Sequence, residues 1–405
     1  MPRTPASAAK LTWTEEHAMT EVVIAGIGQI PVGEHYDLSL RSMGVRALMQ
    51  AIHDSRDLKP DALYIGNMLA SMISHQANLG ALFTDYAHLN GVESYTTEAA
   101  GASGAAALRL GVLSILSGYA DTVAVLGVEK WSDLLREEAE ARLTQEMDFD
   151  FEAIPGLTSS GLAALIQHRY LHEHDLSSEA LSGFALLAHA NATSNPNAFH
   201  RQPLSAEAYN RGAQTSDPLN RFDGGSYADG AAAVILTRLD RLPADYPHAI
   251  IRIAGTGASS DSLSWHDRYE PLSFSAAANA VFAATQQAEV KPEQISLFEL
   301  DDAFSIYAAL TLETCGMADV GRSWQQARDG DFALSGRLPL MTMGGSLARG
   351  NAIGAVGVYQ IVEAVTQLRG QAGANQVPDA RRALTLSLGG AASTAIAHVL
   401  ERVSD

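Results

Sequence analysis

The stretch Val22-Val23-Ile24-Ala25-Gly26-Ile27-Gly28 recurs near the middle of the chain as Ile250-Ile251-Arg252-Ile253-Ala254-Gly255-Thr256-Gly257. Each stretch is short and largely apolar, which is typical of a strand covered on both faces. Further paired segments follow both strands in the same order: 58–65 with 290–297, a small-residue helix from Gly101 with one around 350–355, and 123–127 with 383–389. An ordered series of this kind indicates two copies of one α/β unit.

Between the copies lies a segment of different character, roughly residues 130–245. It begins with an acidic, helix-like stretch from Glu137 to Glu152, which we interpret as a solvated face. Insertions between core elements commonly carry binding surface. We therefore predict an N-terminal domain at 19–249 that includes the insertion 130–245, and a C-terminal domain at 250–405. Residues 1–18 are interpreted as a leader or a cloning remnant ahead of Met19.

The composition narrows the class of protein. The 405 residues are 47% hydrophobic and 18% charged, as in ordinary globular proteins, and the formal net charge is −19. This charge argues against nucleic acid and anionic membranes, which are bound by clustered Lys and Arg. The single cysteine, Cys315, excludes a disulfide framework and a cysteine-rich metal site. We expect a cytoplasmic protein with no membrane segment.

A glycine-rich turn at residues 98–108, Glu-Ala-Ala-Gly-Ala-Ser-Gly-Ala-Ala-Ala-Leu, opens a helix of very small residues. It resembles the nucleophile turn of thiolases, Cys-Ala-Ser-Gly followed by a buried helix. Other matching motifs stand in the family's order: Gly127-Val128-Glu129-Lys130, Asp229-Gly230-Ala231-Ala232-Ala233, Glu299-Leu300-Asp301-Asp302-Ala303-Phe304 and Gly344-Gly345-Ser346-Leu347-Ala348-Arg349-Gly350. From about Val22 onward the chain is similar to the thiolase superfamily, in its archaeal acetoacetyl-CoA thiolase and sterol-carrier-protein-x branch.

The resemblance implies a thiolase-like α/β fold with two duplicated βαβαβαββ halves stacked as five layers. In this fold two five-stranded sheets enclose the central helices, and the insertion forms a loop region. The resemblance also implies a coenzyme A thioester as substrate or ligand, with no permanently bound cofactor and no metal. It further implies a homodimer or larger homo-oligomer, and a small OB-fold, zinc-ribbon partner protein.

Four positions that carry thiolase chemistry differ here. By the resemblance, the nucleophilic cysteine maps to Gly101, and the histidine of His-Asp-Ala-Phe maps to Asp301. The histidine of Gly-His-Pro maps to Asn351, and the second cysteine maps to Ser387, which makes Ser387 a candidate pocket residue. Because glycine has no side chain, no thioester can form at position 101.

The substituted residues still suit a different chemistry. A carboxylate such as Asp301 beside apolar walls has a raised proton affinity, which suits general acid/base catalysis. The amide of Asn351 can donate a hydrogen bond to a carbonyl oxygen. Together they predict non-covalent carbon–carbon cleavage or formation of the aldolase type on acyl-CoA; steroid side-chain aldolases look like thiolases that lack the cysteine.

Two alternatives stay open. In the first, Asp301 and Asn351 only hydrogen-bond loops, and the protein is a non-catalytic paralogue that binds acyl-CoA or supports a partner subunit. In the second, the protein is an acetyl-CoA acetyltransferase with an unusual nucleophile. Ser103 is the candidate substitute, but it needs a base within reach, and we favour a structural role.

Other polar residues receive structural interpretations. Tyr227 is a candidate pocket acid, although packing is the favoured role. Glu98 and Asp302 are interpreted as supports of their turns. The histidines at 168, 172 and 174 are spaced i, i+4, i+6, so only the first pair shares a helix face, and we favour surface residues over metal ligands.

Overall fold

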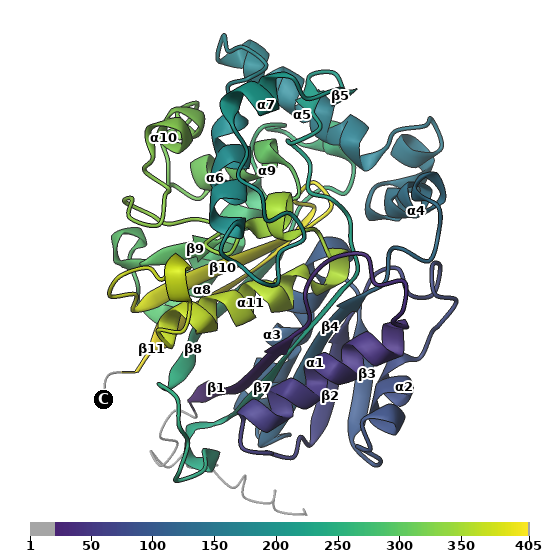
Figure 1. Cartoon of the computed structure of the whole chain (residues 1–405), viewed down its shortest axis with the longest axis vertical. Helices are drawn as coiled ribbons and strands as arrows, with labels where there is room; N and C mark the ends of the chain where they lie inside the picture. The colour runs from purple at the N-terminus through teal and green to yellow at the C-terminus, as the bar shows by residue number, and fades with distance from the viewer. Residues whose placement is uncertain (1–20, 404–405) are drawn as a thin grey trace, which may run out of the picture.

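The protein is described by a computed structural model covering residues 21–403, so the interpreted leader 1–18 and Met19 lie outside the described residues. Two α/β units form the core (Figure 1). The first unit contains β1 (Val22–Gln29), α1 (Leu40–Asp54), β2 (Ala62–Gly66), α2 (Leu79–Tyr86), β3 (Glu93–Thr97), α3 (Ser103–Leu116), β4 (Thr122–Glu129) and β7 (Gly230–Arg238). The second contains β8 (Ile251–Ser260), α8 (Ser275–Ala288), β9 (Leu297–Glu299), α9 (Ser305–Thr314), α10 (Ser323–Asp329), α11 (Val356–Leu368), β10 (Arg382–Gly389) and β11 (Thr394–Arg402).

The strands run in the order β3-β2-β4-β7-β1-β8-β11-β10-β9. The two units join where β1 and β8 pair antiparallel through Val23 and Arg252. The first unit thus supplies five strands, as expected, but the second supplies four. At the place of its fifth strand, Leu340 forms only an isolated parallel bridge with Phe298. The expectation of two five-stranded sheets is therefore corrected for the second unit.

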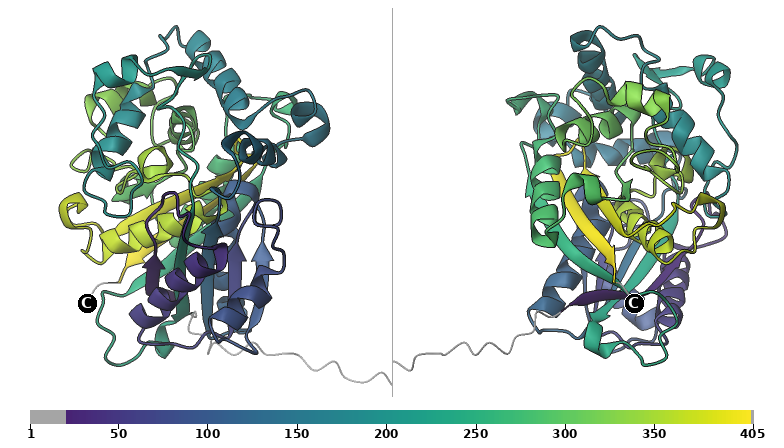
Figure 2. Two further views of the ribbon diagram at one scale, coloured as in Figure 1. Left: turned by 45° about the vertical axis from the view of Figure 1, so that its right-hand side comes forward. Right: turned by 90° about the vertical axis from the view of Figure 1, so that its left-hand side faces the viewer.

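The helices complete the expected five layers (Figure 2). Helices α1 and α2 pack on the outer face of the first unit's strands, and α8 covers the outer face of the second unit's strands with α9 beside it. Helices α3 and α11 lie between the two sets of strands and contact each other. The prediction of a duplicated α/β fold with buried small-residue helices is confirmed.

Both central helices begin with the same backbone turn. A 3-10 turn at Ala100–Ala102 leads into α3, and one at Ile353–Ala355 leads into α11. Ala100 and Ile353 both adopt left-handed φ values, 49° and 48°, which cost energy in residues other than glycine. The shared strained turn is a structural sign of the duplication.

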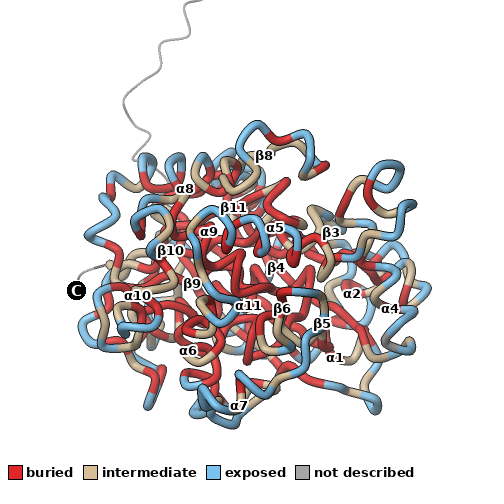
Figure 3. Tube along the Cα trace, turned by 90° about the horizontal axis from the view of Figure 1, so that it is seen from above, coloured by how far each residue is buried: buried red, intermediate tan, exposed pale blue. Residues whose placement is uncertain are grey.

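The insertion lies between β4 and β7 and spans residues 130–229. Because β7 pairs with both β1 and β4 in the sheet, the predicted boundary at 245 is placed too late. Seen from above, the buried chain is concentrated around β4 and α11, whereas α7 lies at an exposed edge (Figure 3). The elements of the insertion are α4 (Arg136–Leu143), α5 (Ser159–Glu173), α6 (Ser182–Ala192), α7 (Ala206–Asn210), β5 (Gln214–Ser216) and β6 (Leu219–Asn220).

A helix that crosses a bilayer must be both long and apolar. Within residues 21–403, no helix combines the length and the apolar character that a membrane span requires.

Candidate active site

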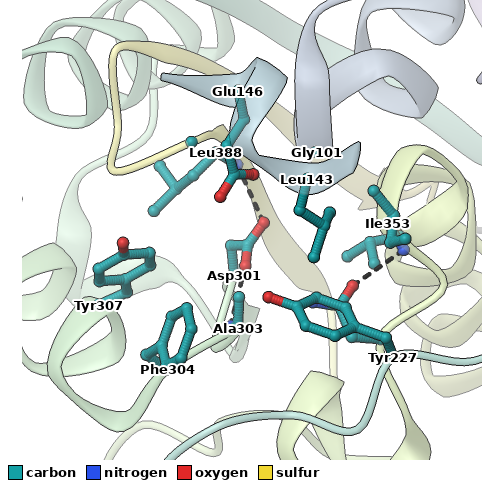
Figure 4. A pocket seen from close by; sticks show the side chains of 13 residues that line it. Gly101, Leu143, Glu146, Tyr227, Asp301, Ala303, Phe304, Tyr307, Ile353 and Leu388 are labelled. Carbon is teal, nitrogen blue, oxygen red and sulfur yellow. Dashed lines mark hydrogen bonds between the residues drawn. The ribbon is translucent and has the colours of Figure 1, made fainter. Parts of the chain in front are cut away.

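A small pocket lies where the two units meet the insertion (Figure 4). The space in it that is open to water is about 30 Å³, enough for about two water molecules. Four of the residues singled out from the sequence line it: Gly101, Tyr227, Asp301 and Asn351. The fold thus brings together residues that are far apart in the chain.

The space beside Gly101 is filled by the main chain. A Cβ atom at this position would lie 2.6 Å from the carbonyl oxygen of Leu388. Real Cβ atoms essentially never approach backbone this closely, so a side chain here requires the Leu388 segment to move. The turn has therefore closed over the position to which the resemblance assigns the nucleophile.

This closure leads to a prediction for the Gly101→Cys variant. We expect it to remain unacylated after incubation with acetyl-CoA or acetoacetyl-CoA, and to lose about 1–3 kcal/mol of unfolding free energy through overpacking. Mass spectrometry and chemical denaturation measure the two effects. The control is Gly33→Cys, where the nearest atom to an added Cβ lies at 3.6 Å. Acetylation of the cysteine introduced at position 101 would contradict the prediction.

Asp301 lies two residues after the end of β9 and is 5% exposed. Its Oδ2 accepts a hydrogen bond from the Leu388 N–H at 3.1 Å, and its Oδ1 accepts one from the Ala303 N–H at 3.1 Å. Burial raises the pKa of the Asp301 carboxyl above its usual range, and these backbone donors offset part of the shift. The carboxylate is thus fixed in position with an increased affinity for a proton.

A second carboxyl in the pocket belongs to Glu146, in a 3-10 turn (Thr144–Glu146) of the insertion. It faces Asp301 across the pocket (Figure 4). Burial raises the pKa of Glu146 to about 7; the Ser159 hydroxyl lowers it, and the charge of Asp301 raises it further. The interpretation of the stretch 137–152 as a solvated face is wrong for Glu146. It is also wrong for buried Glu152, which accepts the Trp265 N–H at 2.8 Å.

Two tyrosines add hydroxyl groups to the same space. The Tyr227 ring packs 4.8 Å from the Trp131 ring, centre to centre, and its hydroxyl points toward Asp301 in Figure 4. Tyr307, from α9, is buried at the other side of the pocket. Burial, with the charge of Glu146 adding to it, holds the pKa of Tyr307 well above its usual value, so this hydroxyl keeps its proton at neutral pH.

Asn351 is held by hydrogen bonds on both its side chain and its backbone. Its Oδ1 accepts from the Ile353 N–H at 2.9 Å, which orients the amide and directs Nδ2 to act as the donor. Its backbone N–H donates to Ser226 at 2.8 Å, and its carbonyl accepts from Ala228 at 3.0 Å. These two contacts also position Tyr227, which lies between Ser226 and Ala228.

The two serine candidates lie outside the lining of this pocket. Ser103 is buried; its hydroxyl donates to the Ala100 carbonyl at 2.6 Å and accepts from the Ala99 N–H at 2.9 Å. Ser387, on β10, donates to Oε1 of Gln360 at 2.6 Å. The Ser103 hydroxyl thus stabilises the backbone turn before α3, and the Ser387 hydroxyl links β10 to α11.

The remaining polar candidates have structural contacts. Glu98 accepts from the Ala100 N–H at 2.6 Å, and Asp302 accepts from the N–H of Ser346 at 2.6 Å. Burial raises the pKa of the Cys315 thiol to about 12, which makes it a poor nucleophile.

The histidine candidates were placed on α5 and at its end. His168 and His172 are exposed on this helix, and His174 packs edge-on against Tyr170. Among residues 21–403, no group of three or more His, Cys, Asp or Glu side chains is arranged to hold a metal ion.

Comparison with known proteins assigns the family. A model described as "Thiolase, N-terminal domain" matches residues 22–207, and one described as "Thiolase C-terminal domain-like" matches residues 257–402. An acetyl-CoA acetyltransferase of Methanothermobacter thermautotrophicus is 34% identical over 388 residues, which covers 95% of this chain and 100% of that protein. The chain belongs to the thiolase superfamily.

Two further similarities concern lyases. This thiolase-superfamily chain is 25% identical over 371 residues to 17-hydroxy-3-oxo-4-pregnene-20-carboxyl-CoA lyase of Mycobacterium tuberculosis, covering 86% of this chain and 92% of the lyase. A solved structure named Ltp2-ChsH2(DUF35) aldolase superposes with a TM-score of 0.83 at 22% identity, covering 95% of this chain and 98% of that one. The second similarity concerns the fold.

Sequence reasoning missed Glu146 and Tyr307. One signal for Glu146 was present, since the apolar residues Leu143 and Met147 interrupt the acidic stretch and are both buried. An acidic residue between two buried apolar side chains is drawn toward the interior with them. Tyr307 carried no separate signal, because it lies in the otherwise apolar start of α9.

Proposed function

We propose that this thiolase-superfamily protein cleaves or forms a carbon–carbon bond in a β-hydroxyacyl-CoA thioester by aldolase-type chemistry, without an acyl-enzyme. One observation carries the proposal: the buried carboxyl of Asp301 lies in the same pocket as Gly101, where the main chain fills the place of a nucleophile's side chain. The coenzyme A thioester is a substrate, and no permanently bound cofactor takes part.

In the cleavage direction, Asp301 acts as the base that removes the proton of the β-hydroxyl group. The Cα–Cβ bond then breaks, a carbonyl forms at Cβ, and the electron pair moves to the thioester as an enolate. The Asn351 amide, through Nδ2, stabilises the enolate oxygen. The names of the lyase and aldolase relatives support this type of reaction.

The test is incubation of the protein with short, β-branched and aromatic β-hydroxyacyl-CoA thioesters. We expect release of an aldehyde or ketone, trapped as a hydrazone, together with an equal amount of the shortened acyl-CoA. Coenzyme A binding without turnover of any of them would favour the non-catalytic alternative. Thiolysis of acetoacetyl-CoA with a covalently acylated residue would favour the acetyltransferase instead.

We further propose that the chain forms a homodimer through the free edge of its sheet. β3 lies at the end of the strand order, and unpaired strand edges readily pair with another copy. Tyr95 on β3 is 57% exposed and stacks on Tyr64, and Tyr119 nearby is 69% exposed. These rings are an apolar surface that a second copy would cover.

The dimer proposal predicts the effect of Tyr95→Asp. Wild type is expected to sediment at twice the chain mass, and the variant is expected to shift toward the monomer, because the new charges face each other across the paired edges. Analytical ultracentrifugation measures both. The control is Tyr269→Asp, since Tyr269 is 96% exposed and lies in the second unit. A monomeric wild type would refute the proposal.

A small OB-fold, zinc-ribbon partner protein is also proposed. Its support is the likeness to the structure named Ltp2-ChsH2(DUF35) aldolase, together with exposed apolar side chains on the insertion: Leu135, Phe149, Phe151 and Ile154. Co-purification of such a protein from the native host, lost on Phe151→Asp, is the expected result.

A further inference from the structure

The pocket contains two carboxyl groups contributed by different parts of the chain. Asp301 comes from the core, two residues after the end of β9, and Glu146 comes from the insertion. Their side chains face each other across the pocket (Figure 4). The groups around them are Tyr227 and Tyr307, whose hydroxyls line the same space, and the hydroxyl of Ser159 beside Glu146.

The cations whose charge acts on this pocket are paired with groups outside its lining. Arg349 influences Asp301 from a distance, but its guanidinium pairs with buried Glu363 at 2.7 Å. Arg268, whose charge acts on Tyr307, donates to the Ala391 carbonyl at 2.6 Å. Two carboxyl groups that share a small pocket without a cation between them do not both ionise at neutral pH, so the pair retains a proton.

The hydrogen bonds decide which member carries that proton. Asp301 accepts two backbone N–H groups, and such donors stabilise the ionised form. The hydroxyl of Ser159, near Glu146, forms no hydrogen bond in the structure, and burial is the main cause that raises the pKa of Glu146 to about 7. Asp301 is therefore the carboxylate and Glu146 the carboxylic acid in the resting site.

We propose that Glu146 is the second catalytic carboxyl of this pocket and acts as the general acid opposite the base Asp301. The inference rests on the proposed function and adds to it the group that returns a proton to the product. It also gives the insertion a chemical role, because the acid of the pair belongs to the insertion rather than to either duplicated unit.

The proton balance of one turnover follows from this assignment. Asp301 takes the proton of the β-hydroxyl as the Cα–Cβ bond breaks and a C=O bond forms at Cβ. Glu146 gives its proton to Cα of the enolate, which yields the shortened acyl-CoA. The pair begins and ends with one proton, which moves back from Asp301 to Glu146 before the next cycle. No oxidant, reductant or metal is required.

The test compares Glu146→Gln with Glu138→Gln. Glu138 is an exposed residue of α4 in the same acidic stretch, so the control makes the same Glu-to-Gln change outside the pocket. For Glu146→Gln we expect kcat to fall by about 10²–10⁴-fold with little change in KM, the range typical of a lost general acid. The wild-type rate should decline as the pH rises through about 7, where Glu146 loses its proton. Retention of the wild-type rate and pH profile by Glu146→Gln would overturn the proposal.

A partial reaction isolates the acid step. The protein should catalyse exchange of the Cα protons of acetyl-CoA with deuterium from D₂O, and Glu146→Gln should exchange more slowly than Glu138→Gln. Equal exchange by the two variants would also overturn the role of Glu146.

A second readout does not depend on turnover. A carboxyl whose pKa is raised in the folded state binds its proton more tightly there than in the unfolded chain. Its contribution to stability is therefore present at low pH and is lost as the pH rises from about 4.5 toward about 7. Glu146→Gln should gain stability relative to wild type across this window in denaturation experiments, and Glu138→Gln should not.

The two failures are thus distinguishable. A wild type that turns over none of the β-hydroxyacyl-CoA thioesters refutes the proposed function, even if the stability difference appears. A stability difference that does not vary with pH refutes the protonated Glu146, whatever the activity.

Discussion

Asp301→Asn is expected to lower kcat/KM for cleavage of a β-hydroxyacyl-CoA thioester by about 10²–10⁴-fold, the range typical of a lost general base. The amide keeps the shape of the side chain but cannot accept the hydroxyl proton. It also places an NH₂ group against one of the two backbone N–H donors, Leu388 or Ala303, which now point at the carboxylate. Asp301→Ala should lose activity to a similar extent.

The pH dependence of the wild type follows from the same group. Burial raises the pKa of Asp301, so activity should fall as the pH drops through a value above the ordinary aspartate range. The measurement is kcat/KM against pH with an aldehyde-trapping assay. Ser387→Ala is the control, since Ser387 lies outside the pocket and bonds to Gln360. If Asp301→Asn kept the wild-type kcat/KM, Asp301 would not be the base.

Asp229→Ala is expected to cost about 3–5 kcal/mol of unfolding free energy, the cost typical of breaking a buried ion pair. Asp229 is fully buried and accepts Nζ of Lys130 at 2.8 Å and the backbone N–H of Trp131 at 2.6 Å. The N–H groups of Ser132 and His35 bind the same carboxylate, each at 2.8 Å. Without it, the Lys130 ammonium, which is 1% exposed, keeps only neutral partners and the partly exposed Asp133.

Chemical denaturation near pH 7 measures this cost. Asp240→Ala is the control, because Asp240 pairs with Arg238 at 2.7 Å but is 61% exposed, and such surface pairs contribute about 0–1 kcal/mol. Although burial works in the opposite direction, hydrogen bonds from Lys130 and Ser132 hold the pKa of Asp229 below its usual range. Wild type should therefore lose this stabilisation as the pH falls through that lowered pKa. Equal losses in the two variants would show that Asp229 is not structurally special.

The fold could be predicted from the sequence because it depends on local patterns, namely apolar strands and the glycines within them. The strands β1 and β8 are apolar runs whose glycines lie against the helices behind them; a Cβ at Gly28 would lie 2.3 Å from the Ala47 carbonyl oxygen, and one at Gly257 would lie 2.1 Å from that of Ala280. Where a strand backbone lies this close to a helix backbone, only glycine fits, because any other residue carries a Cβ atom. Because the glycines of β1 and β8 have the same spacing, the sequence alone predicts that the two halves are copies of one unit.

The number of strands that the second unit contributes could not be predicted from the sequence. The segment around Leu340 follows the expected order of elements, but it pairs with β9 only through a single bridge. Pairing of an edge strand depends on how the preceding turns direct the backbone, and the residue pattern alone does not specify that direction.

The sequence by itself determined the duplicated α/β architecture and the absence of a nucleophile at Gly101, because apolar periodicity and the chemical identity of a residue are both local properties. Only the tertiary structure decided which groups surround that position. Successive side chains of a strand point to opposite faces, so Ser387 contacts Gln360 while its neighbour Leu388 lines the pocket. A shift of the strand register by one residue would exchange the faces on which the two residues lie. Folding of the insertion over the core placed Glu146 opposite Asp301; burial in that position raises the pKa of Glu146, and the charge of Asp301 adds to the rise.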